Sequence, residues 1–383
     1  MWPFRSPRDN TVSSALPQSL LLTDAALSRG IDDLFRATEH QAQGLILRWG
    51  GELLVKPAHA LPILEARFQP YGYAPFLKRA RDLTWIEAVP LAAVVTRRRP
   101  AVNLVLFLLT ALSTFAAGAL PMGAIPFVNF DPLTDPMNLL HGIAFAGTLL
   151  AILVTHEFGH YFTARSYRAS VSLPYFIPAP PPFLFGTLGA IISMRSPARD
   201  RNSLFDIAVG GPIAGLAVAL PALWVGLRWS RVADIPAGGN VTFGDSLLTA
   251  FVTYLRFGSI PDTQDVFIHP VALAAWVGLF VTALNLFPVG QLDGGRIAYA
   301  LFPSRHRAVS IGTFGALLAL GIAMRSGNWI VFAALVFLLV GFRHAPPLDD
   351  LTPLSRGRYA VGVFCLILLI LLIPPVPIQI FGE

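Results

Sequence analysis

The chain has 383 residues, of which 54% are hydrophobic and only 13% charged, and its mean hydropathy is +0.61. Soluble domains carry about 25% charged residues, so this composition excludes an ordinary soluble protein and predicts a polytopic membrane protein. The formal net charge is +6, but the basic residues cluster at the borders of apolar segments. That is the positive-inside pattern rather than a nucleic-acid-binding patch. We therefore expect the lipid bilayer, and no nucleic acid, as a partner.

The first 96 residues predict a soluble part. Residues 1–22 lack the apolar core of a signal peptide and are expected to form a disordered tail. Residues 23–96 predict a small α+β domain, in which His40 and His59 have no partner at metal-binding spacing. Its expected elements are a helix over 22–38, two short strands over 44–55 joined at Gly50-Gly51, a helix over 57–68, and strands over 73–78 and 83–89.

Residues 97–383 alternate apolar segments with polar borders and predict a transmembrane domain. Segments long enough, or nearly so, to cross about 30 Å of hydrocarbon are expected near 101–120, 137–165, 204–227, 270–288, 308–323, 329–342 and 360–373. Arginines gather at the borders 78–99, 165–201, 296–307 and 343–358, which places the N-terminal domain inside and the C-terminus outside. In the third span, Gly211 and Gly215 have a spacing that lets another helix approach closely, and the second span is the expected neighbour.

A metal-binding motif lies inside the second apolar segment, in the sequence HEFGH at residues 156–160. On a helix, His156 and His160 lie one turn apart on one face, so both imidazoles can bind one metal ion. Glu157 can then accept a proton from a water that the metal activates. It is the only glutamate between Glu87 and Glu383, and an ionisable residue in a lipid-facing span is costly and usually functional. The motif predicts a catalytic metal site.

The stretch between the second and third spans predicts neither a helix nor an ordinary loop. Five prolines from Pro174 to Pro182 forbid a regular helix. Residues 183–194 are too few to span a membrane and too apolar for a solvated loop. Irregular backbone at membrane depth is tolerated only where protein or a water-filled cavity covers it. We expect a re-entrant β-hairpin whose edge strand binds an extended substrate peptide; a packed plug without a role in substrate binding is the alternative. The expected substrate-binding residues are Gly186, Thr187, Leu188, Gly189, Ala190, Ile191 and Ile192.

A catalytic zinc site needs a third protein ligand besides the two histidines. Asp293 is the expected ligand, because it lies at the inner end of the fourth span, at the depth expected for the histidine pair. Asn285 is expected to face the same cavity and to stabilise an oxyanion, with a helix-capping role as the alternative. Other polar residues are expected elsewhere: Asp206 as a helix cap or partner of Arg199 or Arg201, His141 and His269 on the outer side, and His306 and His344 at a solvated inner border.

Together these residues resemble the site-2 protease family of intramembrane zinc metalloproteases. The resemblance rests on the HEFGH motif and on residues 285–295, where Asn285, Pro288 and Asp293 have the spacing of the family's second motif. The sequences PYFIP at 174–178 and SLFDIAVGGP at 203–212 are most similar to the ethylene-dependent gravitropism-deficient and yellow-green branch, found in plastids and bacteria. The resemblance covers residues 100–345. Leu286 and Arg296 depart from the usual pattern, and no PDZ module is inserted between spans.

The resemblance implies a role for each site residue. His156, His160 and Asp293 would bind one Zn²⁺ per chain. Glu157 would be the general base, and Asn285 would assist at the oxyanion. Transmembrane protein substrates are the implied partners.

We therefore expect an α-helical polytopic membrane protein with about seven spans, a re-entrant β-hairpin and a small N-terminal α+β soluble domain. The expected activity is that of a zinc metalloendopeptidase that hydrolyses peptide bonds in or near transmembrane segments. A divalent-cation transporter is one alternative, disfavoured by the apolar outward half of the second span; a non-proteolytic membrane scaffold is another, disfavoured by the intact Glu157. The expected location is a bacterial cytoplasmic membrane, on the grounds that no transit-like leader is seen, with a plastid membrane as the alternative and the active site toward the cytosol.

Overall fold

The computed structural model describes residues 18–80, 82–91, 100–119, 136–179, 183–235 and 241–380. The chain divides into two compact units. The first contains residues 1–95 together with Pro347–Thr352, and the second contains residues 96–346 and 353–383. The predicted tail over residues 1–22 lies largely outside the described residues, and the part that is described, 18–22, is helical.

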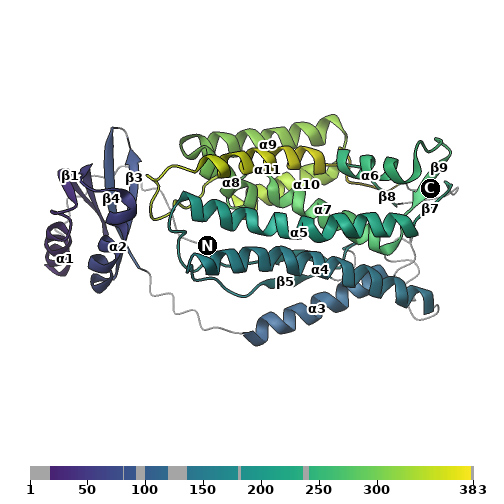
Figure 1. Cartoon of the computed structure of the whole chain (residues 1–383), viewed down its shortest axis with the longest axis horizontal. Coiled ribbons are helices and arrows are strands. Elements are labelled where there is room, and N and C mark those ends of the chain that lie inside the picture. The colour runs from purple at the N-terminus through teal and green to yellow at the C-terminus, as the bar shows by residue number, and fades with distance from the viewer. Residues whose placement is uncertain are drawn as a thin grey trace. The chain divides into compact units, whose positions relative to one another are not determined.

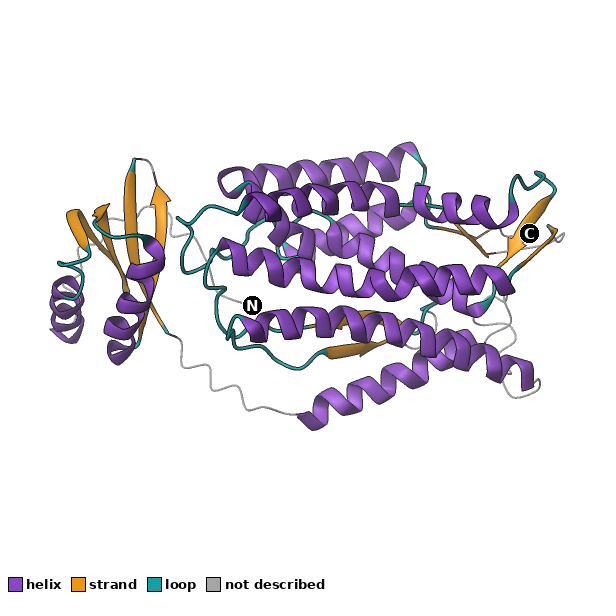
Figure 2. Ribbon diagram, viewed as in Figure 1, coloured by secondary structure: helices purple, strands orange, loops and turns teal. Residues whose placement is uncertain are grey.

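The first unit is a four-stranded antiparallel sheet with two helices (Figures 1 and 2). Its elements are α1 (Gln18–Arg29), β1 (Phe35–Gln43), β2 (Ile46–Leu53), α2 (Pro57–Phe68), a 3₁₀ turn (Gln69–Tyr71), β3 (Tyr73–Ala80) and β4 (Leu83–Pro90), and the strand order is β1-β2-β4-β3. Trp49, Phe68 and Leu77 are fully buried in its core. Residues 347–352 join the edge of β3, where the backbone N–H of Leu77 donates to the carbonyl of Leu348 at 2.7 Å.

Two of the predicted elements of this unit are wrong. The helix expected over 22–38 ends at Arg29, because residues 35–43 pair with β2 instead, and such long-range pairing outweighs local helix propensity. Gly50-Gly51 is no turn but lies within the continuous strand β2. There a Cβ on Gly51 would come within 2.0 Å of the carbonyl oxygen of Arg36, so glycine permits close strand approach. The predicted helix over 57–68 and the strands near 73–78 and 83–89 are confirmed.

The second unit is mainly helical. Its helices are α3 (Pro100–Gly118), α4 (Pro136–Ser166), α5 (Arg201–Trp229), α6 (Leu247–Phe257), α7 (Pro270–Leu286), α8 (Asp293–Leu301), a 3₁₀ turn (Pro303–Arg305), α9 (His306–Ala323), α10 (Gly327–Leu335), a π-helical turn (Val336–Val340) and α11 (Arg356–Leu372). Helices occupy all seven segments in which spans were predicted, whereas α6 and the separate α8 were not foreseen. Among the residues that the structure describes, four helices are long and apolar enough to cross a membrane, at Pro100–Gly118, Met137–Ser166, Arg201–Trp229 and Pro303–Ala323.

Short antiparallel strand pairs connect these helices. β5 (Tyr175–Pro178) pairs with β6 (Thr187–Ile191), β7 (Arg231–Asp234) with β9 (Gln264–Phe267), and β8 (Val241–Phe243) with β10 (Ile378–Ile380). The β5–β6 pair lies alongside α3 and α4 (Figure 2). Thus an extended segment lies beside the helix that carries the HEFGH motif.

The centre of the second unit is built from α4, α5 and α7, which contact one another along their lengths (Figure 1). Small residues allow this close packing: a Cβ on Gly159 of α4 would come within 2.3 Å of the carbonyl oxygen of Gly210 of α5. A Cβ on Gly278 of α7 would come within 2.8 Å of the side chain of Ile152 on α4. The packing brings polar groups on α4, α5 and α7 to one buried place.

Candidate metal centre

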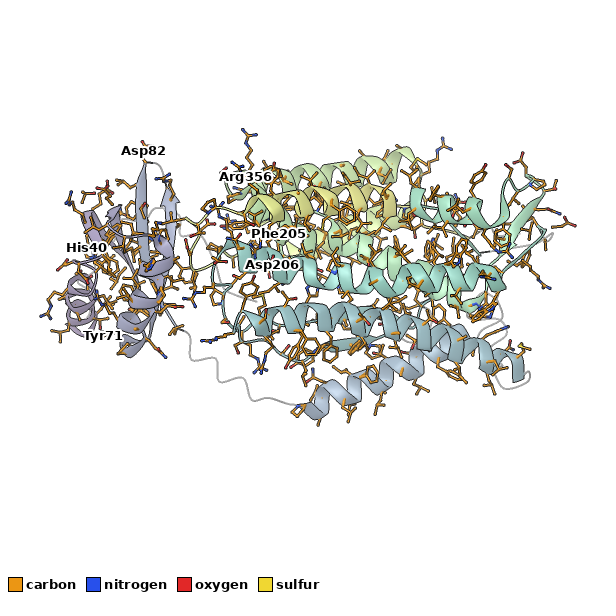
Figure 3. The ribbon with its side chains drawn as sticks, in the orientation of Figure 1. His40, Tyr71, Asp82, Phe205, Asp206 and Arg356 are labelled. Carbon is orange, nitrogen blue, oxygen red and sulfur yellow. The ribbon has the colours of Figure 1, made fainter. Side chains whose placement is uncertain are left out.

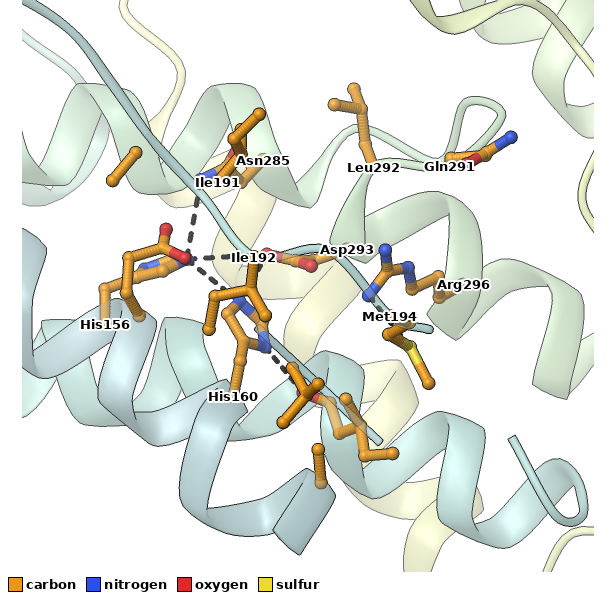
Figure 4. Close-up of a pocket in the computed structure, with 15 residues that line it drawn as sticks. His156, His160, Ile191, Ile192, Met194, Asn285, Gln291, Leu292, Asp293 and Arg296 are labelled. Carbon is orange, nitrogen blue, oxygen red and sulfur yellow. Dashed lines mark hydrogen bonds and ion pairs between the residues drawn. The ribbon is translucent and has the colours of Figure 1, made fainter. Parts of the chain in front are cut away.

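The two histidines of the motif lie on the inward face of α4. His156 and His160 are buried, with 3% and 6% of their surface exposed, and their ring centroids are 4.9 Å apart. Their Nε2 atoms are 3.2 Å apart. Since one helical turn separates the two residues, both nitrogens point to the same place (Figure 4).

Asp293 completes a three-residue group with the histidine pair. It is the first residue of α8, not part of the preceding helix, because α7 ends at Leu286 and an irregular segment follows. Its Oδ2 atom lies 3.0 Å from Nε2 of His160 and 3.4 Å from Nε2 of His156. The donor atoms of His156, His160 and Asp293 all lie within 4.8 Å of one another. This group can hold a metal ion.

The spacing of the donor atoms fits zinc. In a tetrahedral site with bonds of about 2.0–2.1 Å, neighbouring ligand atoms are about 3.3 Å apart. The separations of 3.2, 3.0 and 3.4 Å are close to that value. In addition, Nδ1 of His160 lies 2.6 Å from the carbonyl oxygen of Ile207 on α5. A carbonyl can only accept, so Nδ1 carries the proton and Nε2 keeps its lone pair for a metal.

Glu157 and Asn285 face the cavity beside this group. Glu157 is 5% exposed, and the cavity that it lines has a volume of about 130 Å³. Asn285 lies in the last turn of α7, with its amide nitrogen 3.5 Å from Nε2 of His156 (Figure 4). The cavity therefore has room for water beside a carboxylate and an amide donor.

The strand β6 contributes to the cavity with its C-terminal end only. Ala190 and Ile191 of the strand line the cavity together with Ile192, which follows the strand, whereas Gly186, Thr187, Leu188 and Gly189 do not. The first of these four is packed against α3: the hydroxyl of Ser113 donates to the carbonyl of Gly186 at 2.6 Å, and a Cβ on Gly186 would come within 2.2 Å of the carbonyl oxygen of Ser113. Thr187 donates to the carbonyl of Ile177 on β5 at 2.9 Å.

Two glycines of α5 make room for the histidines. A Cβ on Gly211 would lie 2.1 Å from Nε2 of His160, and one on Gly215 would lie 3.2 Å from Nδ1 of His156. The spacing of these glycines predicted close approach of the second and third spans, and these contacts confirm it. What spacing could not indicate is that Gly211 lies against the imidazole itself.

Several polar residues lie elsewhere than predicted. Asp206, labelled on α5 in Figure 3, pairs with Arg358 of α11 and with Tyr167, not with Arg199 or Arg201. The cap of α5 is Asp200. His306 is buried and His344 is partly buried, rather than solvated: they pack with Tyr299, at ring centroid distances of 5.5 and 4.9 Å. His141 and His269 lie near each other, with centroids 6.5 Å apart, and are absent from the metal-binding group.

The cavity also contains residues that sequence reasoning did not assign to it. These are Ala164, Val171, Met194, Ile207, Gln291, Leu292 and Arg296. For Arg296 a signal existed, since it follows Asp293 by one helical turn in α8. The others depend on the packing of segments distant in sequence.

Comparison with known proteins agrees with this geometry. Residues 144–325 match peptidase family M50. The chain contains a peptidase family M50 domain. The predicted resemblance to the site-2 protease family is thereby confirmed, and all the residues of the metal centre lie within the M50 domain.

Two proteins to which this chain is similar are named probable zinc metalloproteases. The chain is 32% identical over 294 residues to EGY1, chloroplastic, of Arabidopsis thaliana, covering 72% of this chain and 53% of that protein. It is 27% identical over 372 residues to EGY2, chloroplastic, of the same plant, covering 92% of this chain and 64% of that protein. The chain thus spans about half to two thirds of the length of these relatives. No solved structure gives a significant match.

Proposed function

We propose that this protein is an intramembrane zinc metalloprotease that hydrolyses peptide bonds in or near transmembrane segments. The observation that carries the proposal is the convergence of His156, His160 and Asp293 on one point, beside Glu157, in a buried cavity of an M50 domain. Four helices of the described part of the chain are long and apolar enough to cross a membrane, and one of them carries both histidines. The names of the relatives as probable zinc metalloproteases support the same activity.

His156, His160 and Asp293 are the residues that would hold the ion. A zinc ion in such a site is a Lewis acid that lowers the pKa of water toward about 7 and polarises a carbonyl. Glu157, facing the cavity, takes the proton of the attacking water and then passes it to the leaving amine. The amide N–H of Asn285 donates to the developing oxyanion of the substrate. The apolar walls formed by Ile191, Ile192 and Leu292 exclude bulk water from these steps.

The end of β6 is proposed to bind the substrate backbone. A peptide bond within a transmembrane helix is shielded by its hydrogen bonds, so the substrate must unwind before cleavage. Pairing with Ala190–Ile192 at the cavity would replace the backbone hydrogen bonds lost on unwinding. The β5–β6 pair then acts as the re-entrant hairpin. Replacing Ile191 with proline should lower turnover of a transmembrane substrate while zinc content stays at one per chain; unchanged turnover would contradict this role.

The activity can be tested on purified protein in detergent or liposomes. Zinc content is measured by elemental analysis, and cleavage is followed with a labelled single-span substrate. We expect one zinc per chain, and cleavage that a zinc chelator abolishes and added zinc restores. Cleavage that survives complete zinc removal would contradict the proposal.

A divalent-cation transporter would need a polar route to the outer face. Between His141 and His156, α4 carries no ionisable residue. Phe145, Leu149 and Leu153 of this half are buried in an apolar cluster with α7. Metal uptake into sealed vesicles distinguishes the two functions, and we expect none.

A non-proteolytic scaffold would need no general base. Glu157 is present and faces the cavity, which favours the protease. Cleavage of the labelled substrate distinguishes these two functions.

We propose the cytosolic side as the side of the active site, because the arginine-rich borders lie at that end of the spans. The relatives named above are chloroplastic, so a plastid membrane stands beside a bacterial cytoplasmic membrane as the location.

A further inference from the structure

One cation, Arg296, lies in the wall of the active-site cavity that Glu157 and Asp293 also line. Arg296 is the only arginine or lysine among the residues that line the cavity. It follows Asp293 by three residues in α8, so the two side chains lie on one face of that helix. Figure 4 shows Arg296 beside Met194, and Nη1 of Arg296 lies 3.9 Å from the sulfur of Met194.

Arg296 has no ion-pair partner among the residues that the structure describes. Glu157 and Asp293 line the same cavity, yet neither forms an ion pair with it. Other arginines of the chain are paired, as Arg48 is with Glu87 and Arg358 with Asp206. Among the described residues, Arg296 thus makes no direct ion pair with a carboxylate, and its charge acts on Glu157 only across the cavity.

Arg296 also lies close enough to His344 for its charge to act on that imidazole. His344 and His306 lie with Tyr299 in an aromatic cluster. Burial, and after it the charge of Arg296, lowers the pKa of His344 to about 3, so its imidazole is neutral at pH 7. A partly buried guanidinium without an anion is costly, and its planar fork matches a carboxylate.

We propose that Arg296 forms a subsite for an acidic side chain, so that the protease prefers substrates with aspartate or glutamate close to the scissile bond. This inference rests on the proposed proteolytic function and names its substrate class. The carboxylate comes from a side chain, since the substrate continues on both sides of the bond that is cut.

The position of the subsite follows from the geometry of the cavity. Arg296 is one helical turn from the ligand Asp293, about 5–6 Å between Cβ atoms. An extended peptide advances about 3.3 Å per residue, so the acidic residue lies within about three residues of the scissile bond. The nearby walls, made by Val171, Ile192, Met194 and Leu292, are apolar. The substrate is thus an apolar segment with one acidic residue near the cleavage point.

The test uses matched single-span substrates that carry glutamate, glutamine or lysine at each position from three before to three after the scissile bond. For the wild-type protein we expect kcat/KM to be about tenfold higher for glutamate than for glutamine at one or more of these positions. In Arg296→Gln the ratio should fall to near one, and in Arg296→Glu lysine should be preferred at that position. Arg296→Lys should keep part of the preference for glutamate. Arg307→Gln, an exposed arginine of α9, is the matched control and should keep the full ratio.

A binding measurement separates this inference from the proposed function. Glu157→Gln, with its general base removed, is titrated with fluorescent glutamate and glutamine peptides, alone and combined with Arg296→Gln. Tighter binding of the glutamate peptide that depends on Arg296 supports the subsite even if no peptide is cleaved, in which case the proposed function fails instead. Equal kcat/KM and equal binding of the two peptides at every position, or a preference that survives in Arg296→Gln, would overturn the subsite.

Discussion

Two polar clusters connect α4 and α5, and they balance their charges in different ways. In one, which involves Tyr167 just after α4 and Asp206 of α5, the carboxylate of Asp206 accepts from Nε and Nη2 of Arg358 at 2.8 and 2.7 Å. Tyr167 also donates to this carboxylate. In the other, the carboxylate of Asp293 faces two imidazole nitrogens on α4 and has no arginine or lysine partner among the described residues.

The difference between the clusters shows which of them needs a bound cation in addition to the groups of the chain itself. Asp206 has a complete set of partners supplied by the chain, so this cluster serves to join helices. Around Asp293 three atoms with lone pairs point at one another, an arrangement that favours a bound cation. An aspartate at the border of an apolar helix can thus be structural or metal-binding, and its partner decides which. The following predictions test this contrast.

The largest effect is expected from removing one donor atom of the metal centre. His160→Ala should lower zinc content from one per chain to near zero and reduce cleavage by more than about 10³-fold, because two remaining ligands do not hold zinc in a catalytic site. Elemental analysis and the single-span cleavage assay measure both. His306→Ala is the control, because this buried histidine lies outside the metal-binding group. The zinc content of that variant should be unchanged. Full zinc occupancy in His160→Ala would contradict the ligand set.

Glu157→Gln should separate metal binding from chemistry. The variant keeps the size of the side chain but cannot accept a proton, so we expect turnover to fall by about 10²–10⁴-fold. Zinc content should remain at one per chain, because Glu157 is not part of the metal-binding group. Cleavage at the wild-type rate by purified Glu157→Gln would rule out the proposed mechanism.

Gly211→Ala should disturb the metal centre without removing a ligand. The added methyl group would lie 2.1 Å from Nε2 of His160, so the imidazole must move. We expect zinc affinity to fall by about 10–100-fold, as for other changes that misplace a ligand. Competition with a fluorescent zinc chelator measures this. Gly147→Ala on α4, where the methyl group would meet nothing within 4 Å, should bind zinc like the wild type; equal affinities for the two variants would argue against the contact.

The smallest effect on the site is expected from the Arg358 cluster. Asp206→Asn should lower the free energy of unfolding by about 1–2 kcal/mol, because it weakens charged hydrogen bonds that are partly buried. Zinc content should stay at one per chain. Thermal unfolding of Asp206→Asn, Arg358→Gln and the double variant gives the coupling between the two residues, and the double variant should lose less than the sum of the single losses. Loss of zinc in Asp206→Asn would remove the contrast between the clusters.

The site could be predicted from the sequence to a large extent, and the soluble unit less well. The HEFGH spacing and the depth of Asp293 indicated three side chains that the structure brings together. The strands of the first unit were harder, because residues 35–43 form β1 only through pairing with a strand that follows them. Likewise, the attachment of residues 347–352 to the edge of β3 joins segments about 270 residues apart, and no local pattern indicates it.

The sequence by itself determined the class of the protein and the chemistry of its centre. Long apolar segments must either span a membrane or be buried inside the protein. A lone glutamate between two histidines inside such a segment must face a functional site. Only the tertiary structure decided the surroundings: Gly211 against an imidazole, Arg358 on Asp206, and Arg296 in the cavity wall without an ion-pair partner among the described residues. The physical reason is that helical spacing acts within one turn, whereas these contacts arise where α4, α5, α8 and α11 pack, and packing depends on the shapes of distant segments.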